Sequence, residues 1–167
     1  MEDIRSIYYS KFLSLVVSQY ESQIKGAKPG HCMKIEGLPL SEMQKLIRLI
    51  RPLNPELLLY ILSDRLTGED YIHATKLIEL RNNPEKPLLV LIPANSSTSA
   101  EDSYGDATCQ NLSVSELIIL FFHKLQDEIP SDKKYIWNEL VQLFKGNRIP
   151  LDTAINYLLF VNLNHYT

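Results

Sequence analysis

Two stretches of the chain are apolar at every position, which is typical of strands inside a parallel sheet. They are Leu57–Leu62 and Leu88–Ile92, and Ser63 and Pro93 end them. Strands that are covered on both faces need no polar alternation, as in α/β proteins. The segment between them, roughly Tyr71–Asn83, has the residues of a helix. Strand, helix and strand within about thirty-five residues predict a βαβ unit with a right-handed crossover.

The residues before this unit predict two helices and one strand. Apolar residues recur at helical spacing from Glu2 to about Lys25, and Gly26 marks the end of that helix. Cys32–Glu36 alternates apolar and polar residues, which favours a short edge strand. A second helix is expected after Pro39, where Ser41 and Gln44 fit a capping box.

The residues after the unit predict a polar loop and then three helices. The loop runs from about Ala94 to Asn111, and Ser113 with Glu116 forms a second capping box. The last helix is expected to have Asp152 as its N-cap. The middle helix, from about 131 to 145, is expected to face inward at Tyr135, Ile136, Leu140, Val141 and Phe144.

These elements predict an α/β fold: a small, mostly parallel sheet with flanking helices and a C-terminal helical portion. We expect a single domain over residues 1–167. Its parts are N-terminal helices and an edge strand (1–54), the βαβ unit and polar loop (55–112) and the helical portion (113–167).

Composition narrows the class of protein without naming a reaction. With 45% hydrophobic residues and a net charge of −3, the chain is neither disordered nor strongly charged. Its apolar runs are far shorter than the ~20 residues of a membrane helix. Cys32 and Cys109 are the two cysteines, with no C-x-x-C spacing and too few for a disulfide framework. Cytoplasmic localisation is the simplest interpretation.

Charge is distributed unevenly along the chain. Residues 1–54 carry a net charge of +3, residues 55–110 carry −5 and residues 111–167 carry −1. The basic first third provides a weak basis for contacts with DNA phosphates. The candidate contact residues are Arg5, Lys11, Lys25, Lys28 and Lys34.

Polar residues at the ends of the predicted strands are the remaining candidates for chemistry. Asp64 follows the first strand, and Glu101, Asp102 and Ser103 lie in the loop after the second. Parallel strands place their carboxyl ends at one edge, so we expect these residues to form a polar cluster there. Carboxylates so placed are able to hold a divalent metal, as in nucleases and phosphoesterases, although solvated loop acids are the commoner case.

The end of the crossover helix carries a second polar group, Glu79, Arg81 and Asn82. A cation suits the C-terminus of a helix, so a structural or interaction role is favoured over catalysis. Because a crossover helix runs antiparallel to its strands, Arg81 is expected near the start of the second strand.

Four motifs resemble the N-terminal region of bacterial defence-associated ATPases, in particular the DptH (DndH) family of phosphorothioate-dependent DNA restriction. The motifs cover about residues 60–112, and their order and spacing carry the resemblance. They are Leu62–Asp64, Ala74–Asn82, Lys86–Pro93 and Thr98–Gly105.

The resemblance implies a parent protein that is an ATPase and DNA translocase. Such a protein works with partner subunits to restrict DNA that lacks phosphorothioate marks. ATP and Mg²⁺ belong to a downstream core, so we expect this chain to be a fragment of a longer protein with no cofactor of its own.

Three functions follow as hypotheses. The leading one is a non-catalytic docking or regulatory domain that binds other subunits of the restriction complex, meets DNA only through the full-length protein and contacts no membrane. The alternatives are a divergent metal-dependent nuclease or phosphoesterase that uses Asp64, Glu101 and Asp102, and a weak DNA-contacting module.

The sequence predicts that the purified chain hydrolyses no ATP above background. Its six glycines form neither G-x-x-x-x-G-K-[ST] nor G-x-G-x-x-G, so no lysine-bearing loop binds the phosphates. Phosphate release measured with Mg²⁺-ATP tests this prediction. Turnover that a point mutation in this chain abolishes would contradict it.

The charge distribution predicts weak DNA binding that decreases steeply with salt. A small basic excess provides few phosphate contacts, so the Kd for duplex DNA should be micromolar or weaker, about 10⁻⁶–10⁻⁴ M, at physiological salt. Fluorescence anisotropy over a salt series measures both quantities. Sub-micromolar binding at physiological salt would instead indicate a dedicated DNA-binding surface.

Overall fold

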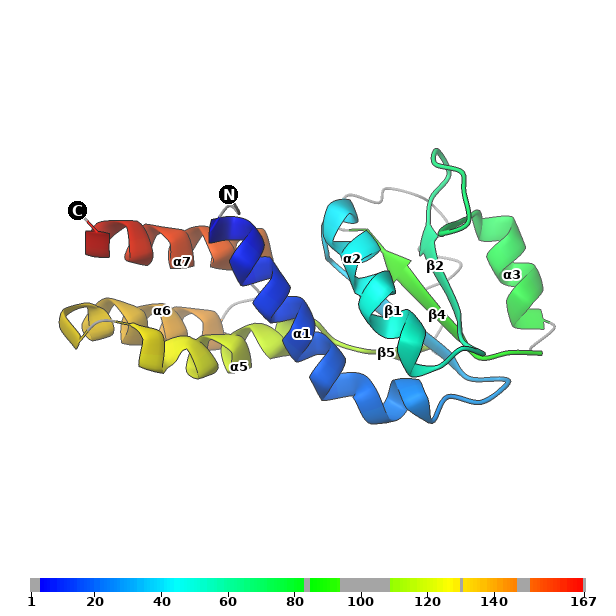
Figure 1. Cartoon of the computed structure of the whole chain (residues 1–167), viewed down its shortest axis with the longest axis horizontal. Helices are drawn as coiled ribbons and strands as arrows, with labels where there is room; N and C mark the ends of the chain where they lie inside the picture. The colour runs from blue at the N-terminus through cyan, green and yellow to red at the C-terminus, as the bar shows by residue number, and fades with distance from the viewer. Residues whose placement is uncertain (1–3, 83–84, 94–108, 130, 147–150, 167) are drawn as a thin grey trace. The chain divides into compact units, whose positions relative to one another are not determined.

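The chain consists of two compact units. We describe it from a computed structural model over residues 4–82, 85–93, 109–129, 131–146 and 151–166. The sheet unit comprises Val17–Ser113, and the helical unit comprises Met1–Val16 with Val114–Thr167 (Figure 1). Helix α1, Ile4–Lys25, contributes its first half to the helical unit and its second half to the sheet unit.

The sheet unit contains a five-stranded sheet in which every pairing is parallel, which confirms the α/β fold class. The strand order is β3-β2-β4-β1-β5. The strands are β1 Cys32–Glu36, β2 Leu58–Leu62, β3 Tyr71–Ile72, β4 Leu88–Ile92 and β5 Gln110–Asn111.

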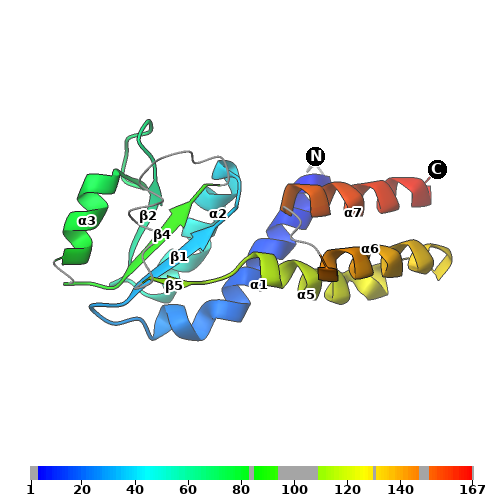
Figure 2. The same cartoon turned by 180° about the vertical axis from the view of Figure 1, so that it is seen from behind.

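Strand β4 lies in the middle of the sheet and is buried at every position. Helix α2, Leu40–Ile50, connects β1 to β2, and α3, Ala74–Asn82, connects β3 to β4. These crossovers run in opposite directions across the sheet, so right-handed connections place the helices on opposite faces. Helix α2 lies in front of the strands in Figure 1 and behind them in Figure 2.

The two faces of the sheet carry separate sets of buried side chains. On the α3 face, Leu77 packs in a cluster with the β4 residues Leu88, Val90 and Ile92. The alternate β4 residues point to the α2 face, because side chains along a strand alternate. Buried residues on that side of the unit are Met33, Ile35, Met43, Leu46, Ile47, Ile50, Leu89 and Leu91.

Two sequence predictions about the strands were wrong. β1 is an interior strand, because β5 pairs with it on the side away from β4. Tyr71–Ile72 was expected to be helical, but it forms β3 and pairs with β2, and α3 begins at Ala74.

The predicted capping residues also differ from the structure. Helix α2 begins at Leu40 after Pro39, and no side chain caps it, so Ser41 lies inside the helix. Helix α5, Ser115–Leu125, has Val114 as its uncapped N-cap residue. Each helix thus begins at a different residue from the one its capping box predicts.

The helical unit is built around α5. Phe121 of α5 makes an edge contact with Phe12 of α1, with ring centroids 5.2 Å apart. Phe122 packs on Trp137 of α6 at 4.8 Å. The other described helices of this unit are α6 Lys134–Gly146 and α7 Leu151–Tyr166, and short 3₁₀ turns span Gln126–Glu128 and Ser131–Lys133. A third 3₁₀ turn, Arg51–Leu53, belongs to the sheet unit.

The predicted inward face of α6 is only partly correct. Val141 is buried and Ile136 and Leu140 are half-buried. Tyr135 is 65% exposed because it lies off the helix face that Trp137 and Val141 bury. The side chain of Phe144 lies outside the described residues. None of the described helices combines the length and the apolarity that a membrane span requires.

The burial of β4 predicts that Leu89→Ala destabilises the sheet unit strongly. Leu89 is fully buried between Met33 of β1 and Leu59 of β2 in the strand register. The variant should lose about 3 kcal/mol of unfolding free energy, from lost burial and a residual cavity. Urea unfolding of the full chain, followed by far-UV circular dichroism, measures the change.

Leu49→Ala is the matched control, since Leu49 is 42% exposed on α2. A surface change of this kind should shift stability by less than about 0.5 kcal/mol. Equal losses in the two variants would contradict the central role of β4.

Candidate functional site

The carboxyl edge of the sheet carries one residue of the predicted polar cluster. Asp64 follows β2 and is exposed, and its Oδ1 lies 3.7 Å from Nδ1 of His73, which follows β3. Glu101, Asp102 and Ser103 lie outside the described residues, so their proximity to Asp64 stays a prediction. Over the described ranges, no group of three or more His, Cys, Asp or Glu residues is arranged to hold a metal ion.

The end of α3 lies at the opposite, amino edge of the sheet. Arg81 and Leu88, the first residue of β4, line the same pocket, which is the location that the crossover geometry predicts. Glu79 pairs with Lys76 one turn away, Nζ to Oε2 3.5 Å, and Asn82 is exposed at the last position of α3. Glu79 and Asn82 therefore lie on the solvated side of α3.

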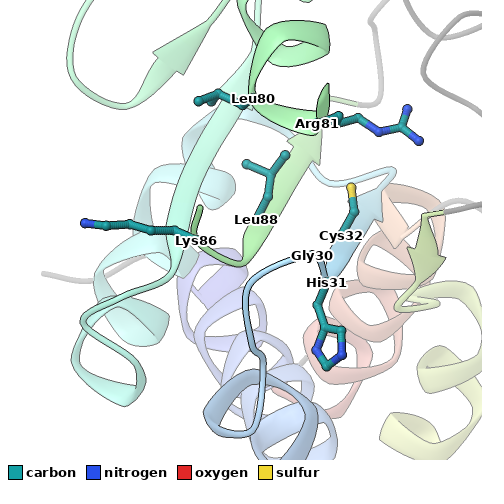
Figure 3. A pocket seen from close by; sticks show the side chains of 7 residues that line it. All are labelled: Gly30, His31, Cys32, Leu80, Arg81, Lys86 and Leu88. Carbon is teal, nitrogen blue, oxygen red and sulfur yellow. The ribbon is translucent and has the colours of Figure 1, made fainter. Parts of the chain in front are cut away.

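A pocket of about 190 Å³ opens at this amino edge (Figure 3). It combines the turn before β1, the end of α3 and the start of β4. Its lining residues are Gly30, His31, Cys32, Leu80, Arg81, Lys86 and Leu88.

The three basic side chains of the pocket do not converge on one point. Figure 3 shows Lys86 pointing away from Arg81, and its Nζ lies 3.8 Å from Oε2 of Glu56. Nδ1 of His31 accepts a hydrogen bond from the backbone N–H of Lys28 at 3.1 Å. Arg81 is the cation on the same side of the pocket as the sulfur of Cys32.

Cys32 and Cys109 form a disulfide that the sequence analysis did not predict. Cys32 opens β1, and Cys109 immediately precedes β5, whose Gln110 pairs with Met33. Neighbouring parallel strands lie about 4.8 Å apart, so the register alone brings the two residues into bonding range. Their Cα atoms are 4.9 Å apart. The two cysteines are separated by 77 positions in the sequence, so no local signal marks this pair.

The candidate DNA contacts are divided between the units, and several pair with carboxylates. Lys25 pairs with Glu21, and Lys34 pairs with Glu36, each at 2.9 Å. Lys11 and Lys28 are exposed. These ion pairs reduce the positive charge that a phosphate backbone would meet.

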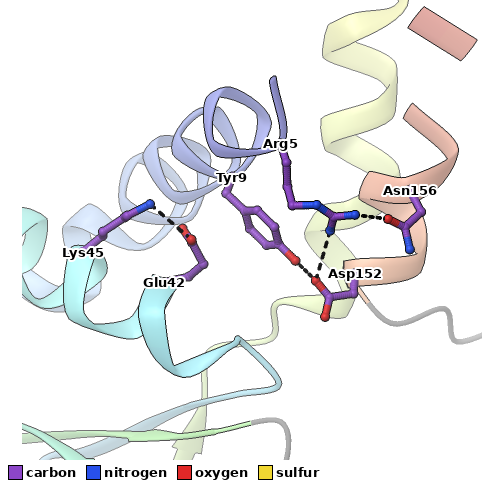
Figure 4. Close-up of polar contacts among 6 residues, drawn as sticks. All are labelled: Arg5, Tyr9, Glu42, Lys45, Asp152 and Asn156. Atoms are coloured by element: carbon purple, nitrogen blue, oxygen red, sulfur yellow. Dashed lines mark hydrogen bonds and ion pairs between the residues drawn. The ribbon is translucent and has the colours of Figure 1, made fainter. Parts of the chain in front are cut away.

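Arg5, the fifth candidate, belongs to a polar network that joins α1 to α7 (Figure 4). Its guanidinium donates to the side chain of Asn156 and lies 3.8 Å from Oδ1 of Asp152. The hydroxyl of Tyr9 also donates to Asp152. Asp152 was predicted to be the N-cap of the last helix, but α7 begins at Leu151 and Asp152 contacts α1 instead.

An apolar groove of about 420 Å³ lies between α6 and α7 of the helical unit. Ile136 and Leu140 come from α6, and Thr153, Asn156 and Tyr157 come from α7. Asn156 belongs both to this groove and to the network with Arg5. The helical pattern predicts that Ile136 and Leu140 face inward, so it gives no indication of the groove that they line.

Glu42 is a buried charged residue that the sequence analysis passed over. It lies in the first turn of α2 and is 6% exposed, and its Oε1 lies 3.2 Å from Nζ of Lys45 (Figure 4). An acidic residue in the first turn suits the helix dipole. We assign it a structural role in α2.

Comparisons of this chain with protein-family models, with curated proteins and with solved structures found no match.

Proposed function

We propose that this chain is a non-catalytic docking module whose helical unit binds an amphipathic helix of a partner protein. The observation that carries the proposal is the apolar groove between α6 and α7. Two helices that lie side by side form a groove into which a third helix packs its side-chain ridges.

The helices around the groove present more apolar surface than their own fold uses. Tyr135 is 65% exposed, Leu143 44% and Tyr157 36%. Of these three residues Tyr157 lines the groove, and the other two lie elsewhere on α6. Large exposed aromatic and aliphatic side chains are typical of binding surfaces. The apolar face of an amphipathic helix would cover the groove and remove this surface from water.

Polar groups at the border of the groove would orient such a helix. Thr153 and Asn156 are the polar lining residues, and Asn156 is held by Arg5. An apolar centre with a polar rim is the usual composition of a protein interface. We therefore expect the bound helix to place its apolar face on Leu140 and a polar residue near Asn156.

The proposed partner is another subunit of a phosphorothioate-dependent restriction complex in the cytoplasm. The order and spacing of the motifs over about residues 60–112 support this context. In this proposal the chain catalyses no reaction, and the parent ATPase acts on DNA while this module holds a partner subunit.

The proposal predicts that Leu140→Asp weakens binding to the partner subunit. A charge in the apolar groove would be buried without a counter-ion, so the Kd should rise by roughly thirtyfold, the effect of losing about 2 kcal/mol at an interface hot spot. Isothermal calorimetry of the full chain with each purified subunit, one at a time, measures the change.

Leu49→Asp, the same substitution on exposed α2 surface, is the matched control and should leave the Kd unchanged. Tyr157→Ala, a milder change, should also weaken binding while far-UV circular dichroism stays as in the wild type. Binding that is insensitive to both groove variants, or no binding to any subunit, would refute the proposal.

A further inference from the structure

The disulfide between Cys32 and Cys109 borders the amino-edge pocket of the sheet unit. Cys32 lines this pocket and is partly exposed, whereas Cys109 is 7% exposed within the apolar cluster on the α3 face. One sulfur of the bond is thus open to a pocket and the other is enclosed by side chains.

We propose that this bond is a thiol–disulfide exchange site, at which an anionic low-molecular-weight thiol of the glutathione class attacks Cys32 from the pocket. The site is independent of the groove in the helical unit and of its proposed partner.

Access to Cys32 is the first argument. An attacking thiolate must reach the sulfur along the line of the bond that breaks. Gly30 lines the pocket with no side chain, and apart from its two chain neighbours no heavy atom lies within 4 Å of where its Cβ would be. Both cysteines contact the apolar cluster on the α3 face, but Cys109 is only 7% exposed there, whereas Cys32 is partly exposed and lines the pocket.

Charge is the second argument. Arg81 carries a permanent positive charge and lies on the same side of the pocket as the Cys32 sulfur (Figure 3). Lys86 points away from Arg81 in Figure 3, and its Nζ lies 3.8 Å from Oε2 of Glu56. Some thiol reagents carry negative charge in addition to that of the thiolate sulfur, whereas others are zwitterionic. Arg81 attracts a reagent of the first kind more strongly.

The reaction balances with two thiols per bond. The reagent thiolate forms a bond to Sγ of Cys32, the Cys32–Cys109 bond breaks, and the Cys109 thiolate takes a proton from water. A second reagent thiolate then attacks the reagent sulfur of the mixed disulfide and releases Cys32. The protein disulfide is reduced by two electrons, and the two reagent molecules are oxidised to their disulfide.

Opening the bond would weaken the attachment of β5 to the sheet. β5 pairs with β1 over two residue pairs, Met33 with Gln110 and Lys34 with Asn111. The N–H of Leu112 also donates to the carbonyl of Lys34 at 2.9 Å. Because the pairing between β5 and β1 is so short, the adjacent disulfide contributes much of the attachment of β5. Reduction of the disulfide would therefore loosen this edge of the sheet.

The test incubates the oxidised full-length chain with reduced glutathione under native conditions and traps the products with acid and an alkylating reagent. Peptide mass spectrometry should locate the glutathione adduct on Cys32. A chain purified in the reduced state should form the disulfide when oxidised glutathione is added. An adduct on Cys109, or exchange that occurs only in urea, would overturn the proposal.

Charge selectivity is tested with Arg81→Gln. The variant should react with glutathione about fivefold more slowly, as expected for loss of one unit charge about 4 Å away in water. Its rate with cysteamine, whose thiolate form is zwitterionic, should change little. Arg65→Gln, at an exposed position outside the pocket, is the matched control. Equal slowing of both reagents, or no slowing of either, would refute the role of Arg81.

Discussion

Burial of β4 on both faces is the constraint on which the sheet unit depends. A parallel strand with neighbours on both sides has its backbone groups paired within the sheet, but its side chains need cover above and below. The crossovers through α2 and α3 run in opposite directions and so supply one helix to each face. The same arrangement brings the end of α3 to the start of β4, and this creates the pocket around Arg81 and Cys32.

The central strands could be predicted from the sequence because their signal is local. Leu58–Leu62 and Leu88–Ile92 are continuous apolar runs, and turn residues lie on both sides of each run. β3 and β5 have two residues each, and Gln110 and Asn111 are exposed and polar, so no periodicity marks them. Their pairing depends on contacts with distant parts of the chain, which short-range patterns do not contain.

In the candidate site, only the features that follow from the strand and helix topology could be predicted from the sequence. The position of Arg81 follows from the direction of a crossover helix, and the structure places it beside Leu88. The bond between Cys32 and Cys109 follows from the register of β1 with β5. Because the sequence pattern does not predict β5, it does not predict this register or the bond. To predict the groove, one must know how α6 and α7 are rotated about their axes relative to each other. The apolar stripe of a single helix does not determine this rotation.

The brevity of β3 and β5 has a consequence for behaviour at high concentration. A long, flat edge strand presents unpaired N–H and C=O groups, to which the edge of another molecule is able to add as an extra strand. Both outer strands of this sheet have only two residues, whereas the inner strands have five. Edge strands this short offer few unpaired backbone groups to another copy of the chain. The sheet therefore keeps a strongly apolar interior without presenting a long edge that favours aggregation.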